Sequence, residues 1–472
     1  MANLHNYHGR YCEAEFESTF LSYLEEAGWS YLAGSSLPRD SMRDVLYTDD
    51  MEFFLNRTNP DLTADEIQQI MDTVRLVGAE SDFAALHKIY GWMVNGSSFV
   101  PKSGQPKMVA LIDFEYPERN IFRAVNQFTV EYTNNGQTEN RRPDILLFIN
   151  GMPLCVIELK NPADANATIY DAWEQINIRY WRDIPHLLHY CPLACISDGV
   201  KTRLGTVRTP YEHFYAWRRV NDGDKVSTLP FDELETMVKG VYAPARCLEI
   251  FRDYIYFQDS EYDGDEREIV CRYPQFFAAR LLKQSIVKSV KGKSGKGGTY
   301  FGATGCGKTY TMAFLARQLA LRCSDVPEIG SPTIVMIVDR EELQKQSAKL
   351  FTKSKEFLNL GEVSVVESRR TLRQELGARE SGGFYICTIQ KFCDREDDKI
   401  GLINNRANII CFSDEAHRTQ LEHAKKIQFS KDSDENMKAL VSKPYAKVLR
   451  EAFPQATFVG IAGMPIMPAP VR

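Results

Sequence analysis

Residues 301–312 read FGATGCGKTYTM, and the rest of the chain is interpreted outward from this stretch. It satisfies the pattern GxxxxGK[ST], in which a glycine-rich turn points backbone N–H groups at phosphate oxygens and leads into a helix. An apolar, strand-like GGTYF precedes the loop and an amphipathic MAFLARQLAL follows it, which is the expected context. The stretch therefore predicts a nucleotide-binding strand, loop and helix, with a chance match as the alternative.

Each residue type in this loop has a physical role. Glycines permit the tight turn and the close approach of phosphate, Lys308 brings a compact positive charge to the β- and γ-phosphates, and the Thr309 hydroxyl is a ligand for Mg²⁺. The loop residues expected to contact the nucleotide or its Mg²⁺ are Gly302, Thr304, Gly305, Cys306, Gly307, Lys308 and Thr309.

Downstream of the loop, apolar runs alternate with amphipathic stretches, which predicts a mostly parallel α/β sheet. The run ANIICFS ends in the acidic sequence DEAH at residues 414–417. We expect Asp414 to hold Mg²⁺ through water and Glu415 to polarise the attacking water. DEAH alone can occur by chance, but its position at a strand end after a phosphate loop favours the functional interpretation.

A helix is expected to begin near residue 273, about 30 residues before the phosphate loop. Gln275 can present both a donor and an acceptor to an adenine edge, and Arg272 and Tyr273 lie beside it. These residues are therefore candidate nucleotide contacts. An ordinary helix start with exposed polar residues is an equally acceptable interpretation.

A second chemical pattern lies in RRPDILLFINGMPLCVIELKNP, residues 141–162. Asn150 and Gly151 predict a hairpin turn between two apolar strands. Residues two apart in a strand face the same side, so Glu158 and Lys160 emerge together, beside Asp144 on the neighbouring strand. Two carboxylates can hold Mg²⁺ while an ammonium orients water or stabilises a phosphate transition state. The pattern matches PD…(D/E)xK nucleases, and the alternative is a hairpin with solvated charged ends.

The segment after this hairpin, from residue 164 to 185, is expected to be a helix with Gln175 near the proposed metal site. At about 100° per residue, Arg179 is the neighbour of Gln175 one turn on. Tyr180 is then well round the helix, and ordinary core packing is its simplest explanation.

Length, composition and charge limit the class of protein and its cellular location. With 472 residues and 44% hydrophobic content, the chain suggests two to four globular domains. We find no run of roughly 20 apolar residues and no signal-peptide core, so a cytoplasmic location is expected. Eleven cysteines without CxxC pairs suggest free thiols. The net charge of −6 neither indicates nor excludes nucleic-acid binding.

The expected organisation is an N-terminal nuclease-type domain over residues 1–220, a connecting segment over 221–271, and a parallel-sheet domain over 272–472. Helices expected at 13–27 and within 60–95 serve as scaffold, the second beginning with the capping box TADE. The acidic, turn-rich connecting segment is expected to enclose a helical LEIFRDYIYF.

With both sites in view, the chain resembles the motor (R) subunit of type I restriction endonucleases. The resemblance rests on strings that occur in family order: LIDFEYPERNIFRAVNQFTV, RRPDILLF, CVIELKNP, RYPQ, GATGCGKTYTM, IVDREELQKQ, CTIQKF and DEAHRTQ. It implies a restriction-endonuclease-like nuclease domain followed by a RecA-like superfamily 2 motor domain. It also implies ATP and Mg²⁺ as cofactors, double-stranded DNA as substrate, cleavage away from the recognition site, and methyltransferase (M) and specificity (S) subunits as partners.

By the same resemblance, a glutamate of the opening helix joins the nuclease site. Glu17 is the first choice, with Glu13 and Glu15 as rivals. The family carries Gln-x-x-x-Tyr after the nuclease strands, whereas here Arg179 occupies the expected tyrosine position, so only Gln175 transfers.

Two further departures from the family concern the motor. Its TGTP motif is AGMP here, at residues 462–465, which removes hydroxyls that couple hydrolysis to movement. The chain ends at residue 472, where the family continues with a second RecA-like domain and a helical region. We therefore expect a fragment that binds nucleotide but hydrolyses ATP weakly and does not translocate.

Two other functions compete with this interpretation. One is a nucleotide-binding assembly module without catalysis, which the altered AGMP favours. The other is a different nuclease and helicase fusion that acts in DNA repair.

Overall fold

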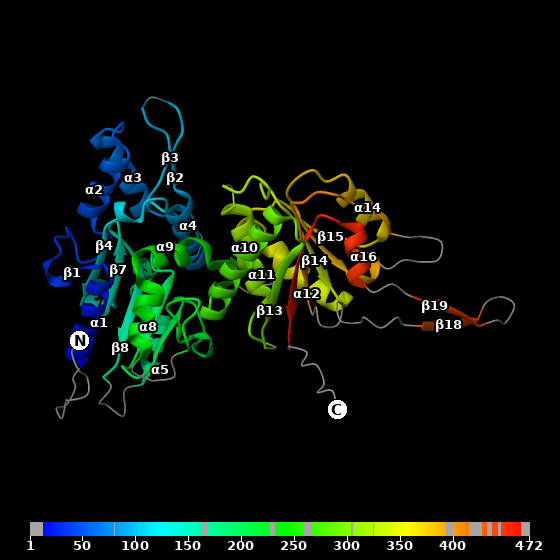
Figure 1. The fold of residues 1–472 in the computed structure, drawn as a ribbon. Helices are drawn as coiled ribbons and strands as arrows, with labels where there is room; N and C mark the ends of the chain where they lie inside the picture. Colours follow the sequence, from blue (N-terminus) through cyan, green and yellow to red (C-terminus); the bar gives the residue numbers. More distant parts are fainter. Residues whose placement is uncertain are drawn as a thin grey trace. The chain divides into compact units, whose positions relative to one another are not determined.

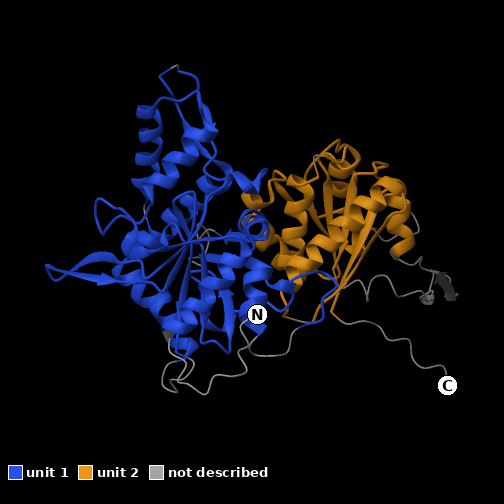
Figure 2. Cartoon of the chain, turned by 60° about the vertical axis from the view of Figure 1, so that its left-hand side comes forward, with its two compact units in different colours: residues 1–273 blue, residues 274–472 orange. Residues whose placement is uncertain are grey.

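The computed structural model describes residues 13–79, 81–102, 104–161, 168–226, 232–258, 266–303, 305–323, 325–392, 400–414, 427–431, 437–441 and 445–463. The chain forms two compact units, residues 1–273 and residues 274–472, shown in blue and orange in Figure 2. Each unit is described by itself below.

Unit 1 is built on a mixed six-stranded sheet with the order β1-β4-β7-β8-β9-β10. Figure 1 labels β1, β4, β7 and β8 of this sheet. The strands are β1 (Ser30–Ala33), β4 (Phe122–Asn126), β7 (Ile145–Ile149), β8 (Met152–Leu159), β9 (Leu193–Ser197) and β10 (Thr202–Gly205). β1 runs parallel to β4 and β8 parallel to β9, while the other neighbours are antiparallel. Every residue of β7 and β8 is buried, so this hairpin forms the centre of the unit.

The turn between β7 and β8 is the predicted Asn-Gly turn. Asn150 and Gly151 have φ of +50° and +78°, and two positive φ values match the twist of a tight hairpin. A Cβ at Gly151 would lie 2.0 Å from the carbonyl oxygen of Tyr47, so only glycine fits. The turn holds the register of the two strands that carry Asp144 and Glu158.

Helices and short strand pairs surround this sheet. The helices are α1 (Glu13–Ala27), α2 (Thr48–Thr58), α3 (Ala64–Arg75), α4 (Asp82–Asn95), α5 (Ile169–Glu174), α6 (Trp181–Asp183), α7 (Pro185–Leu188), α8 (Asp232–Met237) and α9 (Pro244–Asp253). The strand pairs are β2 (Ser97–Phe99) with β3 (Lys107–Val109) and β5 (Val130–Asn134) with β6 (Gln137–Arg141). α1 ends as predicted at Gly28, with φ of +111°. The predicted capping box of Thr63 and Glu66 begins α3.

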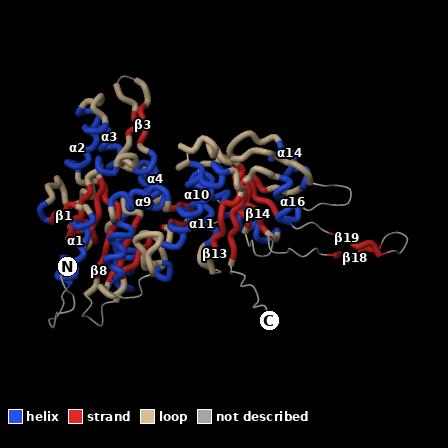
Figure 3. The backbone as a smooth tube through the Cα atoms, viewed as in Figure 1, coloured by secondary structure: helices blue, strands red, loops and turns tan. Residues whose placement is uncertain are grey.

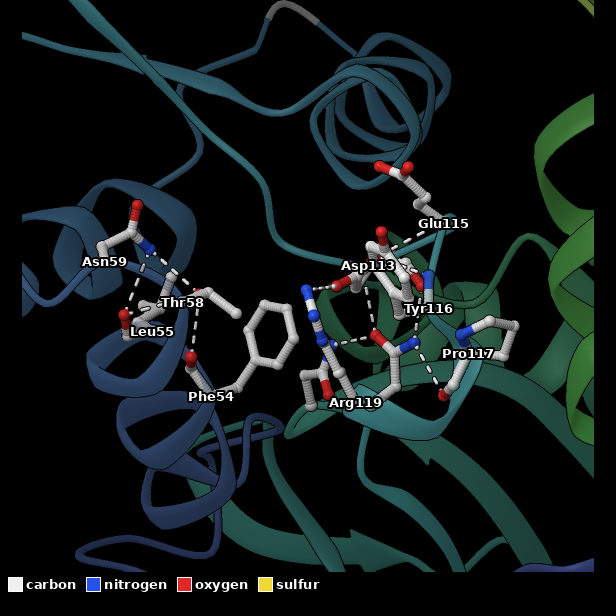
Figure 4. Close-up of polar contacts among 11 residues, drawn as sticks. Phe54, Leu55, Thr58, Asn59, Asp113, Glu115, Tyr116, Pro117 and Arg119 are labelled. Carbon is white, nitrogen blue, oxygen red and sulfur yellow. Dashed lines mark hydrogen bonds and ion pairs between the residues drawn. The ribbon is translucent and has the colours of Figure 1, made fainter.

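The loop that leads into β4 is held by its own side chains (Figure 4). The Asp113 carboxylate accepts hydrogen bonds from the backbone N–H groups of Glu115 (3.0 Å) and Tyr116 (2.9 Å), and its other oxygen lies 3.6 Å from Arg119. A cavity of about 510 Å³ lies beside this loop. Because the Asp113 oxygens are already engaged, we interpret the loop as a structural support for β4.

The described residues between 221 and 271 belong to unit 1. The buried Trp29 indole donates to the carbonyl of Tyr242 (2.6 Å), and the Tyr90 hydroxyl donates to the carbonyl of Phe251 (2.8 Å). The predicted helix LEIFRDYIYF was wrong in its last residues, because α9 ends at Asp253 and β11 (Ile255–Gln258) follows. β11 pairs with β12 (Arg267–Val270), and that pairing favours the extended conformation of the aromatic run.

Unit 2 contains a fully parallel six-stranded sheet with the order β13-β20-β17-β14-β16-β15. Its strands are β13 (Lys296–Phe301), β14 (Thr333–Val338), β15 (Val363–Val365), β16 (Phe384–Thr388), β17 (Ile409–Ser413) and β20 (Thr457–Ala462). The helices are α10 (Tyr273–Gly292), α11 (Lys308–Leu321), α12 (Glu341–Lys353), α13 (Lys355–Leu358), α14 (Arg369–Gly377) and α16 (Tyr445–Ala452), and β18 (Ile427–Lys431) pairs with β19 (Met437–Val441).

The alternation of strand and helix in unit 2 agrees with the predicted parallel α/β sheet, and the tube view of Figure 3 shows it. Leu372 and Leu376 of α14 share one hydrophobic core with Val448 and Leu449 of α16. Phe351 of α12 stacks on Phe384 of β16 with ring centroids 4.5 Å apart. The apolar faces of the helices thus cover the buried strands.

Candidate active site

The structure brings Asp144 and Glu158 together at one end of the β7–β8 hairpin. Antiparallel pairing of Ile145 with Ile157 places the residue before β7 opposite Glu158. The backbone N–H of Leu159 donates to Asp144 Oδ2 at 2.8 Å. Glu158 is fully buried and Asp144 is 8% exposed, so both carboxyl groups are largely withdrawn from water.

The environment of Glu158 opposes its ionisation. Burial, followed by the negative charge of Asp144, raises the pKa of Glu158 well above its ordinary value of 4.5, and Lys160 acts in the opposite direction. Glu158 Oε1 accepts a hydrogen bond from the Tyr180 hydroxyl at 2.6 Å. When both carboxyls are ionised, Oε2 has no donor among the residues that the structure describes. A cation between these groups would supply the missing partner.

A chain of hydrogen bonds connects Lys160 back to Glu158. Lys160 Nζ donates to Gln175 Oε1 (2.9 Å), and Gln175 Nε2 donates to the Tyr180 hydroxyl (2.8 Å). Burial raises the pKa of Tyr180 well above its ordinary value, so its hydroxyl keeps the proton that it donates to Glu158. These hydrogen bonds orient the Lys160 ammonium group and the buried Glu158 carboxyl relative to each other.

The prediction that Tyr180 lies well round the helix from Gln175 was wrong. Residues Gln175–Tyr180 form a π-helix between α5 and α6, in which hydrogen bonds join residues five apart. Gln175 and Tyr180 are therefore one turn apart and face the same way. The inserted residue lets Tyr180 reach the site, whereas Arg179 is exposed and pairs with Glu174 (3.2 Å).

Glu17 of α1 also reaches this end of the sheet. Its two carboxylate oxygens accept hydrogen bonds from Asn126 Nδ2 (2.6 Å) and Gln127 Nε2 (2.5 Å). Gln127 Nε2 lies 3.4 Å from Asp144 Oδ1 as well, so one amide connects two carboxylates. Of the rival glutamates, Glu15 is exposed, and the side chain of Glu13 lies outside the described residues.

Sequence reasoning did not single out Asn126, Gln127 or Tyr180 as site residues. Asn126 ends β4, and the Gln127 backbone N–H donates to the carbonyl of Asp144 (2.9 Å). The signal available in the sequence was the pair of amides at the end of β4 and the acid directly before β7, which is the neighbour of β4 in the sheet. Tyr180 gave no such signal, because its position depends on the π-helix.

These groups offer hard oxygen ligands of the kind that Mg²⁺ prefers. Within the described part of the chain, however, no three His, Cys, Asp or Glu side chains form a ready metal cluster. Asp144 and Glu158 fit a divalent cation best, because the buried Glu158 Oε2 accepts no bond when ionised. Glu17 lies beside them, with its oxygens engaged by amides.

In unit 2, the phosphate loop joins β13 to α11. Gly305 and Gly307 have φ of +79° and +82°, and α11 begins at Lys308. Lys308 Nζ donates to the carbonyl of Gly302 at 3.3 Å. Cys306 and Thr309 are partly exposed in this loop, and Thr304 lies outside the described residues.

Gln275 lies directly against the phosphate loop. Its side chain is buried, and Nε2 donates to the carbonyl of Gly307 (3.1 Å) and reaches that of Cys306 (3.5 Å). Arg272 belongs to unit 1, where its guanidinium stacks on the Tyr215 ring, 3.5 Å from the centroid, and donates to the Tyr215 hydroxyl. The two candidate nucleotide contacts therefore have different surroundings.

Asp414 lies at the same edge of the sheet as the phosphate loop. It directly follows β17, and its backbone N–H donates to the carbonyl of Ile337 (2.9 Å). β20 lies between β17 and β13, so about 10 Å separates the two strand ends, two strand spacings in all. Glu415, His417 and the proline of AGMP lie outside the described residues.

Two further observations concern the described residues of both units. The nine cysteines within the described ranges are free. Among the helices described, none is both long and apolar enough to cross a membrane.

Together, these features define a two-unit α/β protein with a buried carboxylate, lysine and tyrosine cluster in one unit and a phosphate loop in the other. Comparison with protein families agrees with this class. Residues 10–213 match "Type I restriction enzyme R protein N terminus", and residues 274–470 match "SWI2/SNF2 ATPase". The chain therefore belongs to the type I restriction enzyme R protein family and corresponds to the N-terminal part of such a subunit.

Named relatives support the same assignment. The chain is 31% identical to the type I restriction enzyme HindI endonuclease subunit of Haemophilus influenzae, over 96% of this chain and 42% of that protein. It is 30% identical to the putative MjaIXP endonuclease subunit of Methanocaldococcus jannaschii, over 95% of this chain and 42% of that protein. It is 25% identical to the SauCOLORF180P endonuclease subunit of Staphylococcus aureus, over 64% of this chain and 29% of that protein. The chain thus spans about two fifths of the length of the first two relatives.

Proposed function

We propose that this chain is the nuclease and first motor part of a type I restriction subunit. In the complete complex, ATP hydrolysis moves double-stranded DNA, and a Mg²⁺-dependent nuclease cuts both strands away from the recognition site. Recognition and methylation belong to partner S and M subunits, and the complex works in the cytoplasm, where its DNA substrate is found.

One observation carries the nuclease proposal. The fully buried Glu158 carboxyl is packed against Asp144 and connected through Tyr180 and Gln175 to Lys160. A protein gains no stability from a buried acid beside another acid, because burial and repulsion both oppose its charge. Such an arrangement is typical of a functional site that binds a cation.

The proposed roles follow from the contacts. Asp144 and Glu158 hold Mg²⁺, which when bound lowers the pKa of water and polarises a phosphoryl oxygen. Lys160, held by Gln175, faces the phosphate and balances its developing charge. Glu17 completes the acidic edge, and Tyr180 keeps Glu158 in one orientation.

For the motor part, we propose a RecA-like nucleotide site in a domain that begins near residue 272. Lys308 and the loop amides bind the phosphates, Thr309 and Asp414 hold Mg²⁺, and Glu415 polarises water. Gln275 stabilises the loop through hydrogen bonds from its side-chain amide to the carbonyl groups of Gly307 and Cys306. Arg272 remains a candidate contact for the base.

Two substitutions separate the proposed activities in the complete restriction complex. Lys160→Ala is expected to abolish DNA cutting and to leave DNA-stimulated ATPase intact, because Lys160 belongs to the nuclease site alone. Lys308→Ala is expected to abolish ATPase and every ATP-dependent movement. Lys107→Ala, in a surface ion pair with Asp61, is the matched control and should change neither activity. Cutting by the Lys160→Ala complex at the wild-type rate would overturn the nuclease assignment.

A further inference from the structure

A long acid-free segment crosses the first part of unit 2. Residues 269–324 contain no Asp or Glu, whereas the whole chain has 63 acidic residues and a net charge of −6. The same segment contains ten Lys and Arg residues. Such a charge asymmetry inside an acidic protein indicates a local surface for an anionic partner.

Part of this segment forms a groove, which we name the basic groove. Four cations line it: Lys283, Lys288 and Lys291 of α10, and Arg322 after α11. Its volume is about 530 Å³, and Asp325 is the single acid among its lining residues. α10 and α11 are joined here by a hydrogen bond from Lys283 to Gln318 (3.3 Å).

The free cations of the groove are on the surface. Lys288 and Lys291 are exposed, and neither has a hydrogen bond or ion pair with any residue that the structure describes. Val287 and Val326 contribute an apolar floor. Like charges around one hollow repel one another, so the groove is electrostatically complementary to a polyanion.

The groove is distinct from the nucleotide site. α11 begins at Lys308, directly after the phosphate loop, and runs for 14 residues before the groove, a distance of about 20 Å at 1.5 Å per residue. A nucleotide held by the loop therefore does not fill the groove. The lysines of α10 extend over eight residues, about 12 Å, along which duplex DNA carries roughly seven phosphate charges.

We propose that the basic groove binds the phosphate backbone of double-stranded DNA without reading its sequence. The inference rests on the proposed function, which makes duplex DNA the substrate, and it adds where on the motor unit that substrate is held. Lysine ammonium groups are point charges that attract phosphates but do not distinguish bases. A contact of this kind suits a protein that moves along DNA of any sequence.

The test compares DNA binding by the full chain and by a Lys288→Gln/Lys291→Gln variant. Fluorescence anisotropy with two 30-base-pair duplexes of unrelated sequence is measured over a series of salt concentrations. Each lost phosphate contact lowers the slope of log K against log salt by about 0.9, so the double variant is expected to lose nearly two units of slope on both duplexes. Lys102→Gln/Lys225→Gln removes the same charge from exposed positions in unit 1 and should bind as the wild type does.

The possible outcomes separate the inference from the function on which it rests. Wild-type affinity and slope in the groove variant, with an unchanged melting curve, would overturn the groove as a DNA site. If instead the variant binds DNA normally but fails to join the M and S subunits, the groove faces a protein, and the inference is likewise overturned. If the wild-type complex cuts DNA while the groove variant binds it normally, the proposed function stands without the groove. If the wild-type chain and complex bind no duplex, the proposed function itself fails.

Discussion

Replacing Glu158 with glutamine is expected to stabilise unit 1, and the gain should grow with pH. Burial and the Asp144 charge raise the pKa of Glu158 well above 4.5. The folded protein therefore keeps a proton that the unfolded chain releases, so the free energy of unfolding falls as pH rises between the two pKa values. Below the ordinary pKa both states are protonated, and this cost vanishes.

The size of the effect follows from one proton. Each pH unit between the ordinary and the raised pKa costs the wild type about 1.4 kcal/mol. Glutamine is neutral at every pH and nearly isosteric with Glu158, and its oxygen can still accept the hydrogen bond from Tyr180. The difference in unfolding free energy between Glu158→Gln and wild type should therefore increase by about 1.4 kcal/mol per pH unit in this window.

The chain offers a selective assay for this effect. All five tryptophans lie in residues 1–273, so urea unfolding followed by tryptophan fluorescence reports on unit 1. Measurements from pH 5 to pH 7.5, with EDTA present, give the slope. Glu268→Gln is the matched control, because Glu268 is also buried and burial raises its pKa. It should show the same pH-dependent gain.

Adding Mn²⁺ or Ca²⁺ then separates the two glutamates. A cation at Asp144 and Glu158 stabilises only a folded protein that can bind it, so the wild type and Glu268→Gln should gain stability and Glu158→Gln should not. Parallel stability curves for the wild type and Glu158→Gln across the pH range would refute the reasoning. Equal responses of both variants to the cation would refute the metal assignment.

Three further changes test other contacts. Tyr180→Phe removes the hydroxyl between two site residues, so DNA cutting should fall on the order of 10- to 100-fold while ATPase stays unchanged; cutting at the wild-type rate would contradict a role for the π-helix. Gln127→Ala should weaken Mn²⁺ binding about tenfold in electron paramagnetic resonance titrations, and Gln137→Ala, on an exposed strand of the same unit, should leave it unchanged. Gly307→Ala should abolish binding of a fluorescent ATP analogue, because φ is +82° and the new Cβ would lie 2.4 Å from Gln275 Nε2; retained binding would show that the loop adapts.

Much of the fold could be predicted because its signals are local. The Asn150–Gly151 turn, the capping box at Thr63 and the strand, loop and helix around Lys308 depend on neighbouring residues and occur where the sequence places them. The helix predicted over LEIFRDYIYF, residues 248–257, was wrong in its last residues for the opposite reason. Residues 255–258 pair with β12, which lies outside the predicted helix, and α9 therefore ends at Asp253.

The pairing of Asp144 with Glu158 was predictable, because a hairpin with a two-residue turn and period-two strands sets which residues meet. By contrast, the position of Tyr180 depended on one extra residue in a helical turn, and helical periodicity contains no sign of such an insertion. The amide of Gln127 between Glu17 and Asp144 required three separate segments to meet at one end of the sheet.

The sequence by itself determined the family, the two chemical patterns and the order of most elements, because motifs, turns and apolar periods are properties of adjacent residues. Only the tertiary structure decided which amides and which hydroxyl surround the carboxylates, and that the cations of α10 and α11 line one groove. Those facts depend on contacts between segments far apart in the chain, and such contacts form only when the strands and helices pack.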